Sequence, residues 1–444
     1  MAVSLTKAQV TATDRKKFTF SCWLKRGKLS TQENFFTSIH NGSNEFQFRF
    51  DSDDELRWVG SISGSAAGLI NTKRLFRDTS GWYNIVIAGD TTQSTNIDRL
   101  KLYINGEQIA DGDLNTPGYP AQDTNFGFGT TDFNFCFGVS TPGTTNDPFT
   151  GIITHAHFID GTAYDASTFG STDATTGQWE INTSPTVTYG NNGFFILKNS
   201  GSVTDESGNA NNFTLESGTL TNTEDNPSNV FATLNFINNY YPEATFSNGN
   251  LKITTKESAP VMGTIGASSG KYYWEIKVNS LASTYGTLGI VGTQATASTQ
   301  FITSNANEYM YYSQGSLNYN GGSVSTGYDT YTAGDIIGIG MDLDNNRLFV
   351  SKNGTWQNSA DPTTSTGAYT ITAPASTSLG SYFPAVGYWD DNDSANGTYE
   401  VNFGNGYFGT TQISSEGTNA SGIGKFEYDV PTGYTALSTK GLNE

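Results

Sequence analysis

Apolar residues alternate with polar or small residues along much of this chain, with the period of two that half-buried β-strands require. In residues 16–27 the apolar positions of this pattern are Phe18, Phe20, Cys22 and Leu24. The same alternation recurs in the segments 44–58, 81–90, 98–109, 133–139 and 149–161. About six strands at this spacing, without a helical period, predict an antiparallel β-sandwich in residues 1–180.

A second group of alternating segments predicts a second sandwich in residues 231–444, with a C-terminal extension. Its clearest part is a hairpin, in which Ile337, Ile339 and Met341 precede a polar turn at 342–346 and Leu348 and Val350 follow it. Residues 181–230 are rich in Asn, Ser, Thr and Gly and predict a connector, with one or two short strands around the apolar run 194–197. The predicted fold class is therefore all-β, with two tandem antiparallel, jelly-roll-like β-sandwiches.

Three segments of the second half resemble the SPRY domain. They are the strand "GKYYWEIKV" at 270–278, the Gly-rich strand "GTLGIVGT" at 286–293 and the hairpin "DLDNNRLFVSKNG" at 342–354. The resemblance implies a β-sandwich whose loops bind partners and which carries no chemistry of its own. The first half is similar to the LamG, or concanavalin A-like, domain over residues 1 to about 180. The matching motifs, in order, are "FTFSCWLKRG" (18–27), "GWYNIVIAGD" (81–90), "LKLYINGEQIADG" (100–112) and "FTGIITHAHFIDG" (149–161).

The segment between the two sandwiches and the tail "YDVPTGYTALSTKGL" at 428–442 carry a further resemblance. Both are similar to segments that accompany these two domains in proteins of tailed bacteriophages and other large viruses, with Gly441 where Asn is usual. The resemblance implies a virion protein that is made in the host cytoplasm and contacts other virion proteins. Because phage appendages are commonly trimeric, a homo-oligomer is expected, with a trimer favoured.

Charge and hydropathy exclude several classes of function. The formal net charge of -19 in 444 residues disfavours a nucleic-acid partner, which requires a basic surface. No apolar run approaches the roughly 18–20 residues of a membrane span, so we expect no membrane insertion. The first 17 residues lack the apolar core of a secretory signal. Cys22 and Cys136 are too few for a disulfide framework and are interpreted as buried thiols.

The sequence offers no convincing catalytic residues, and we expect a protein that is not an enzyme. Concanavalin A-like glycoside hydrolases need two converging carboxylates, and the nearest match is the run Asp51 to Glu55, which is interpreted as a hairpin turn. His155 and His157 share a strand, but only His40 remains as a further imidazole, so no metal site is predicted there. If an ion binds, Ca²⁺ suits the oxygen-rich run Asp390 to Asp393, which also reads as an acidic surface turn.

Two groups of residues are candidate binding sites. Aromatic rings stack on the apolar faces of sugars and carboxylates accept hydrogen bonds from their hydroxyls, which points to Trp389, Asp390, Asp391, Tyr311 and Tyr312. Residues 1–28 hold seven cationic side chains against Asp14 alone, which suggests that a basic arm docks to an acidic virion partner. The candidates for docking are Lys7, Arg15, Lys16 and Lys17, and a solvated strand face is the alternative.

Three functions remain open at this stage. The first is a tail-fibre-like or head-fibre-like appendage that recognises a host surface glycan or protein without covalent chemistry. The second is a capsid decoration or cementing protein with a purely structural role, which an extended first segment (residues 1–17) holding a neighbouring subunit would favour. The third is a glycan depolymerase, which requires a carboxylate pair that the sequence does not provide.

Overall fold

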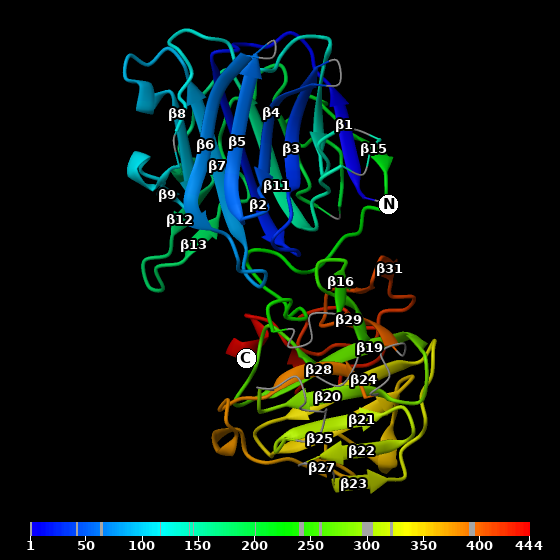
Figure 1. Ribbon diagram of the computed structural model, residues 1–444. Coiled ribbons are helices and arrows are strands. Elements are labelled where there is room, and N and C mark those ends of the chain that lie inside the picture. Colours follow the sequence, from blue (N-terminus) through cyan, green and yellow to red (C-terminus); the bar gives the residue numbers. More distant parts are fainter. Residues whose placement is uncertain are drawn as a thin grey trace. The chain divides into compact units, whose positions relative to one another are not determined.

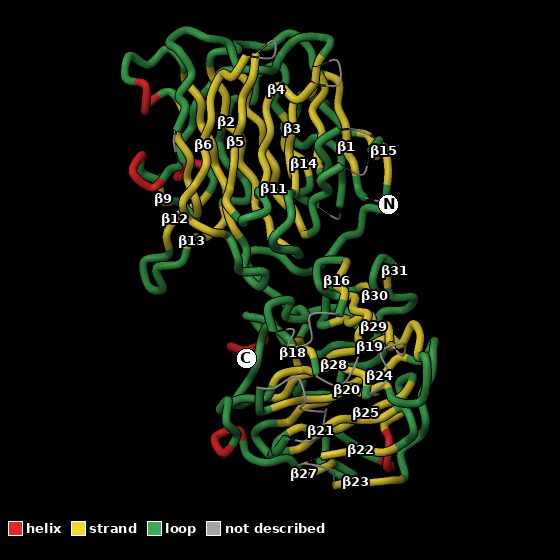
Figure 2. Tube along the Cα trace, in the orientation of Figure 1, coloured by secondary structure: helices red, strands yellow, loops and turns green. Residues whose placement is uncertain are grey.

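The computed structural model describes residues 2–40, 43–62, 65–115, 117–141, 143–144, 146–199, 201–238, 244–256, 260–294, 305–319, 323–389 and 396–444. Contact between residues divides the chain into two compact units, Met1–Asn222 and Thr223–Glu444. Both units consist of β-strands joined by loops, which confirms the predicted fold class (Figures 1 and 2). The helical segments of the described residues are 3-10 turns of three residues each: Asn96–Asp98, Asp111–Asp113, Ala166–Thr168, Gln357–Ser359, Pro374–Ser376 and Gly441–Asn443. None of these described helices has the length or apolar character needed to cross a membrane.

The first unit is a sandwich of two antiparallel sheets. The seven-stranded sheet has the order β15 (Thr214–Ser217), β1 (Ser4–Ala8), β10 (Phe133–Phe137), β3 (Glu33–His40), β4 (Ser43–Phe50), β5 (Glu55–Ile62) and β6 (Ser65–Leu75). The six-stranded sheet has the order β14 (Phe194–Ile196), β11 (Gly151–Asp160), β2 (Lys17–Arg26), β7 (Tyr83–Asp90), β8 (Leu100–Ile104) and β9 (Glu107–Gln108). A separate pair is formed by β12 (Gly170–Thr172) and β13 (Trp179–Ile181).

Aromatic rings fill the space between the two sheets of the first unit. Phe18 and Phe20 of β2 are completely buried, as the alternating pattern of this strand predicts. Phe20 stacks on Phe36 of β3, with ring centroids 4.4 Å apart and planes inclined by 7°. Cys22 and Cys136 are both buried free thiols, in agreement with the sequence-based interpretation. The core of this unit is therefore built from residues of strands on both sheets that face one another.

The predicted connector is instead largely a part of the first unit. Strand β14 pairs with β11 through Phe195 opposite His157, and β15 pairs with β1 through Leu215 opposite Leu5. The boundary between the units falls at Asn222, whereas the sequence predicts a connector over 181–230. The difference arises because Phe194, Ile196 and Phe213 are buried in the core of the first sandwich, where their apolar side chains leave water.

The second unit is also a sandwich. One sheet has the order β16 (Thr245–Ser247), β17 (Lys252–Lys256), β29 (Asn396–Asn402), β19 (Lys271–Leu281), β24 (Ile336–Asp342), β25 (Arg347–Lys352) and β26 (Thr355–Trp356), with β27 (Tyr369–Thr370) beside β25 and β32 (Thr435–Ala436) parallel to β19. The other has the order β18 (Val261–Met262), β28 (Phe383–Tyr388), β20 (Gly286–Val291), β21 (Glu308–Tyr312), β22 (Ser316–Tyr319) and β23 (Ser323–Thr326). The short strands β30 (Tyr407–Phe408) and β31 (Thr411–Gln412) form a hairpin.

The predicted hairpin of the second unit is confirmed as β24 and β25. Met341 lies opposite Leu348 and Ile339 lies opposite Val350. Ile337, Ile339 and Met341 are completely buried, because alternate residues of β24 face the core between the sheets.

A C-terminal segment, residues 403–444, packs on the second unit and forms a smaller apolar cluster there. Phe426 and Tyr434 of this segment are buried against Tyr273 of β19 and Phe349 of β25. The rings of Tyr273 and Phe426 meet edge to face, with centroids 5.1 Å apart. The segment therefore covers side chains of β19 and β25 that do not belong to the main core of this sandwich.

Candidate functional site

Trp389 lies at one end of the six-stranded sheet of the second unit, here named the Trp389 end. Strand register brings the end of β28, the start of β20 and the end of β21 together, because Gly286 lies opposite Tyr388 and Thr287 lies opposite both Gly387 and Tyr312. The loop that joins β19 to β20, residues 282–285, lies at this end. Trp389 follows β28 directly and is 38% exposed.

The ring of Trp389 is exposed but held in place. Its backbone N–H donates to the carbonyl oxygen of Tyr285 over 2.8 Å. The two rings meet edge to face, with centroids 5.0 Å apart and an interplanar angle of 67°. The hydroxyl groups of Ser283 and Tyr388 lie 2.6 Å apart and tie the 282–285 loop to β28. A fixed aromatic ring loses little conformational entropy on binding, which suits it to contact a ligand.

Two of the other predicted binding residues are core residues. Tyr311 is 0% exposed and Tyr312 is 5% exposed, so the prediction that they lie at the surface is wrong. Strand β21 is an inner strand of its sheet, and its two faces pack into different apolar clusters. The Tyr311 hydroxyl donates to the carbonyl oxygen of Asp329. Asp390 and Asp391 lie outside the described residues.

The basic residues near the start of the chain belong to a folded sheet and do not form a free arm. Strand β1 is paired with β10 on one side and β15 on the other. Each of the four predicted docking cations already contacts an oxygen of the first unit. Lys7 Nζ donates to the Ala8 carbonyl over 2.7 Å and Arg15 Nη2 to the Phe126 carbonyl over 3.0 Å. Lys16 lies 2.8 Å from Asp123 and Lys17 lies 3.8 Å from Asp90. Because the acidic partners of Lys16 and Lys17 are remote in sequence, local sequence patterns did not predict these ion pairs.

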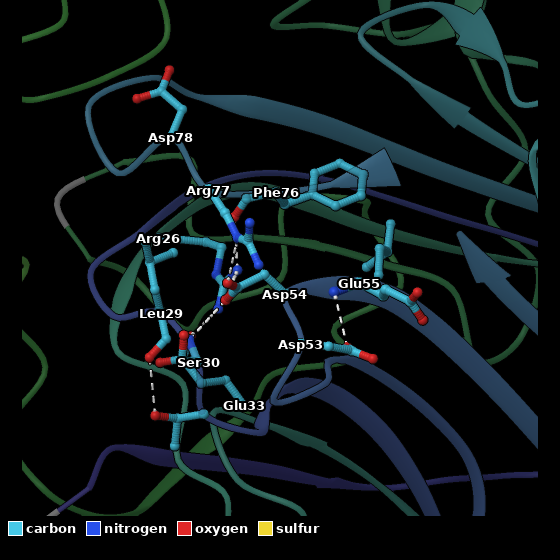
Figure 3. Close-up of polar contacts among 12 residues, drawn as sticks. Arg26, Leu29, Ser30, Glu33, Asp53, Asp54, Glu55, Phe76, Arg77 and Asp78 are labelled. Atoms are coloured by element: carbon cyan, nitrogen blue, oxygen red, sulfur yellow. Dashed lines mark hydrogen bonds and ion pairs between the residues drawn. The ribbon is translucent and has the colours of Figure 1, made fainter. Parts of the chain in front are cut away.

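The acidic run Asp51 to Glu55 forms a turn before β5, as predicted, but one of its carboxylates is buried. Asp54 accepts hydrogen bonds from Arg26 Nη1 over 3.2 Å, Arg77 Nε over 3.0 Å and the Ser30 N–H over 2.8 Å (Figure 3). Its backbone is left-handed, with φ of 71°. The sequence indicated the turn but not that Asp54 would meet a cation from β2.

Arg26 is the centre of this buried group. Its Nη2 lies 3.3 Å from a carboxylate oxygen of Glu33, and its Nη1 donates to the Phe76 carbonyl over 2.7 Å. The guanidinium also lies 4.2 Å from the ring centroid of Phe50. Burial raises the pKa of Glu33 to about 7, although the Arg26 cation draws it down. Both buried carboxylates therefore contact the same guanidinium, in what we call the Arg26 cluster.

The two histidines of β11 also contact protein groups. His157 Nδ1 lies 2.9 Å from the Tyr189 hydroxyl, and its ring stacks on Phe195 with centroids 3.9 Å apart. His155 Nδ1 lies 2.9 Å from the Thr154 hydroxyl, at a bulge in the strand. Burial lowers the pKa of both imidazoles, that of His155 to about 4. Among the described residues, no group of three or more His, Cys, Asp or Glu side chains is arranged to hold a metal ion.

Glu275 of β19, which stands alone in the sequence, is the buried anchor of the C-terminal segment. Its carboxylate accepts hydrogen bonds from the backbone N–H groups of Glu427 and Tyr428 over 2.9 and 2.8 Å. The Tyr273 hydroxyl and the Asn402 amide donate to it over 3.1 and 3.2 Å. Burial raises the pKa of Glu275 to about 7, and the four donors limit the rise.

Comparison with known proteins identifies both units. Residues 2–168 match the family model described as the concanavalin A-like lectin/glucanases superfamily, and residues 271–405 match that of the SPRY domain. Domains of these two kinds commonly mediate binding to carbohydrates or proteins. No curated protein matches the chain.

Two solved structures each match a part of this chain. The SPRY domain of human HERC1 is 16% identical over 36% of this chain and 91% of that one, with a TM-score of 0.27. The native heptameric SAP-like pentraxin from Limulus polyphemus is 13% identical over 45% of this chain and 90% of that one, with a TM-score of 0.30. The two family matches show that this chain carries a concanavalin A-like domain followed in tandem by a SPRY domain.

Proposed function

We propose that this protein recognises a glycan or protein on a host cell surface without covalent chemistry, as an external appendage of a bacteriophage particle. The observation that supports the recognition role is the exposed ring of Trp389, which packs against Tyr285 at the Trp389 end of the SPRY domain. The C–H faces of a sugar stack on such a ring, and a protein partner would bury the same apolar surface. In the sequence, Asp390 and Asp391 follow directly and supply acceptors for hydroxyl groups.

The virion part of the proposal rests on the sequence. The segment between the domains and the tail at 428–442 resemble those of phage virion proteins. The pairing of β1 on both sides leaves residues 4–8 inside the first unit, which favours a receptor-binding role over a decoration role that uses this segment to hold a neighbour. A homo-oligomer, with a trimer favoured, would let several weak sites act together by avidity.

We also propose that the chain has no hydrolytic activity of its own. The buried carboxylates Glu33 and Asp54 both contact Arg26, and each accepts a backbone N–H as well. Their arrangement supports a structural role. A hydrolase needs one carboxylic acid and one carboxylate placed on either side of a glycosidic bond.

Replacing Trp389 with alanine is expected to weaken binding to host cells or to a host surface oligosaccharide about tenfold or more. The reason is the loss of the aromatic surface that the ligand would cover, since 1.4 kcal/mol corresponds to a tenfold change in Kd. Trp389→Phe, which keeps a ring, should retain most of the affinity. Binding of the purified full chain to a panel of host surface oligosaccharides and to intact host cells measures both effects. Unchanged affinity of Trp389→Ala would remove the Trp389 end from the recognition role.

The virion assignment has a separate test. Immunogold electron microscopy with an antibody against the SPRY domain should label fibres or spikes on purified particles. An even coat over the capsid faces would favour the decoration role. Particles without label would contradict the virion assignment, whatever the result for Trp389→Ala.

A further inference from the structure

Strand β23 ends the six-stranded sheet of the second unit and leaves one side of its backbone open (Figure 1). It pairs with β22, and no strand of the described residues pairs with its other side. The N–H and C=O groups on that side can therefore form hydrogen bonds with a strand of another chain. We name this open side of the strand the β23 edge.

Three other sheet edges are protected against such pairing. The edge strand β15 carries the exposed carboxylate of Glu216, and β9 carries that of Glu107. The edge strand β6 is covered where Leu69 forms a bridge with Gly118. Charged side chains and covering segments are usual means by which folded proteins keep sheet edges apart. The β23 edge has neither, as far as the structure describes the chain.

The composition around the β23 edge favours a second copy of this chain as its partner. Residues 309–328 carry no charged side chain, although the whole chain has a net charge of -19. Val324 of β23 is 52% exposed, and Tyr319 of β22 and Tyr328 beyond β23 are partly exposed. Two acidic copies can meet at an uncharged edge without repulsion between carboxylates, and the contact removes apolar surface from water.

The register of the sheet shows how two such edges would match. Met310 lies opposite Asn318, and Asn318 lies opposite Val324, so these three side chains form a row on one face. Ser325 lies on the other face, opposite the buried Leu317. A second β23 in antiparallel register, with Val324 opposite Val324, would extend the row and bring the two exposed side chains into contact.

We propose that β23 pairs with β23 of a second copy of this chain, in antiparallel register about a two-fold axis that places the two Val324 residues opposite each other. Both copies use the same surface, so the contact closes after two copies. This contact goes beyond the proposed recognition by Trp389 and does not depend on it. It makes a dimer of single chains, or joins two trimers if the chain is trimeric, so the assembly holds an even number of chains.

Sedimentation velocity and size-exclusion chromatography with light scattering, on the purified full chain at up to about 100 µM, measure the number of chains. This concentration is needed because a contact of one four-residue strand gives weak association. Val324→Lys should weaken the association about tenfold or more, since the two cations would face each other. Val324→Thr, which keeps an uncharged β-branched side chain, should still associate. Both variants should keep the wild-type thermal midpoint because the position is exposed.

Cross-linking tests the register directly. Val324→Cys should form a disulfide between two copies on mild oxidation, because opposite residues of paired strands lie within reach of a disulfide. The native Cys22 and Cys136 are buried and should not compete. Leu215→Cys is the matched control, at a 41% exposed position of the edge strand β15, and should cross-link far less.

Three results would overturn the proposal: a wild-type chain that is monomeric or trimeric at this concentration, unchanged association of Val324→Lys, or equal cross-linking of the two cysteine variants. Trp389→Ala should associate as the wild type does. Failure of the proposed recognition role would therefore appear in host binding alone, whereas failure of this inference would appear in the number of chains.

Discussion

Arg26→Met is expected to lower the free energy of unfolding of the first unit by about 3–5 kcal/mol. The side chain of Arg26 is completely buried. It forms ion pairs with Glu33 and Asp54, whose side chains are also buried. Methionine fills a similar length but leaves the Glu33 carboxylate in a low-dielectric environment without a cation, and it leaves Asp54 with Arg77 as its remaining cation. The Phe76 carbonyl loses its guanidinium donor as well.

Arg77→Met is the matched control, since Arg77 pairs with the same Asp54 carboxylate over 3.0 Å but its side chain is 58% exposed. Exposed ion pairs contribute only about 0–1 kcal/mol, so this variant should unfold nearly as the wild type does. Chemical denaturation, monitored by hydrogen exchange of peptides from the first unit, measures the free energy of unfolding of both variants. If both variants lost the same free energy of unfolding, burial would not explain the contribution of the Arg26 cluster to stability.

Glu275→Met is expected to lower the free energy of unfolding of the second unit by about 2–5 kcal/mol and to loosen the C-terminal segment. The change leaves the backbone N–H groups of Glu427 and Tyr428 without their acceptor, at about 1–3 kcal/mol for each buried unpaired group. Hydrogen exchange of residues 426–437 should increase before the rest of the unit exchanges. Glu416→Met, at an exposed position of the same segment, should leave exchange unchanged. If residues 426–437 of Glu275→Met exchanged as slowly as they do in the wild type, Glu275 would not anchor the C-terminal segment.

Glu275 also predicts a pH dependence of stability in the second unit. Its pKa is raised to about 7 in the folded protein from an ordinary value of 4.5. The folded state therefore holds a proton that the unfolded chain releases between these two values. The free energy of unfolding should fall as the pH rises from about 4.5 to 7, by up to about 3 kcal/mol. Denaturation curves across this range should show the slope in the wild type and a smaller slope in Glu275→Met. A slope of the opposite sign would contradict the raised pKa.

Local patterns were enough to predict the strands that form the sandwiches. The β24–β25 hairpin follows from alternation on both sides of a polar turn, because the two strands are adjacent in the chain and share one buried face. The exposure of Trp389 was also predicted, since the residue follows a strand and precedes an acidic run. Each of these inferences depends on neighbours within a few residues.

Contacts between distant segments were not predictable in this way. Tyr311 and Tyr312 look like surface aromatics, yet neighbouring residues of a strand point to opposite faces, and here both faces of β21 are covered. Two of the donors to the Glu275 carboxylate, the backbone N–H groups of Glu427 and Tyr428, come from residues about 150 positions later. Residues 181–222 have the composition of a connector, but burial of their few apolar side chains assigns them to the first unit.

The sequence by itself therefore determined the all-β class, the order of the two domains and the exposed aromatic residue, because period-two alternation and turn residues act locally. The tertiary structure alone decided which charges are buried, as with Arg26 and Glu275. The physical reason is that burial and hydrogen bonding of a side chain depend on strands that pair across the fold, and a single sequence does not record those partners.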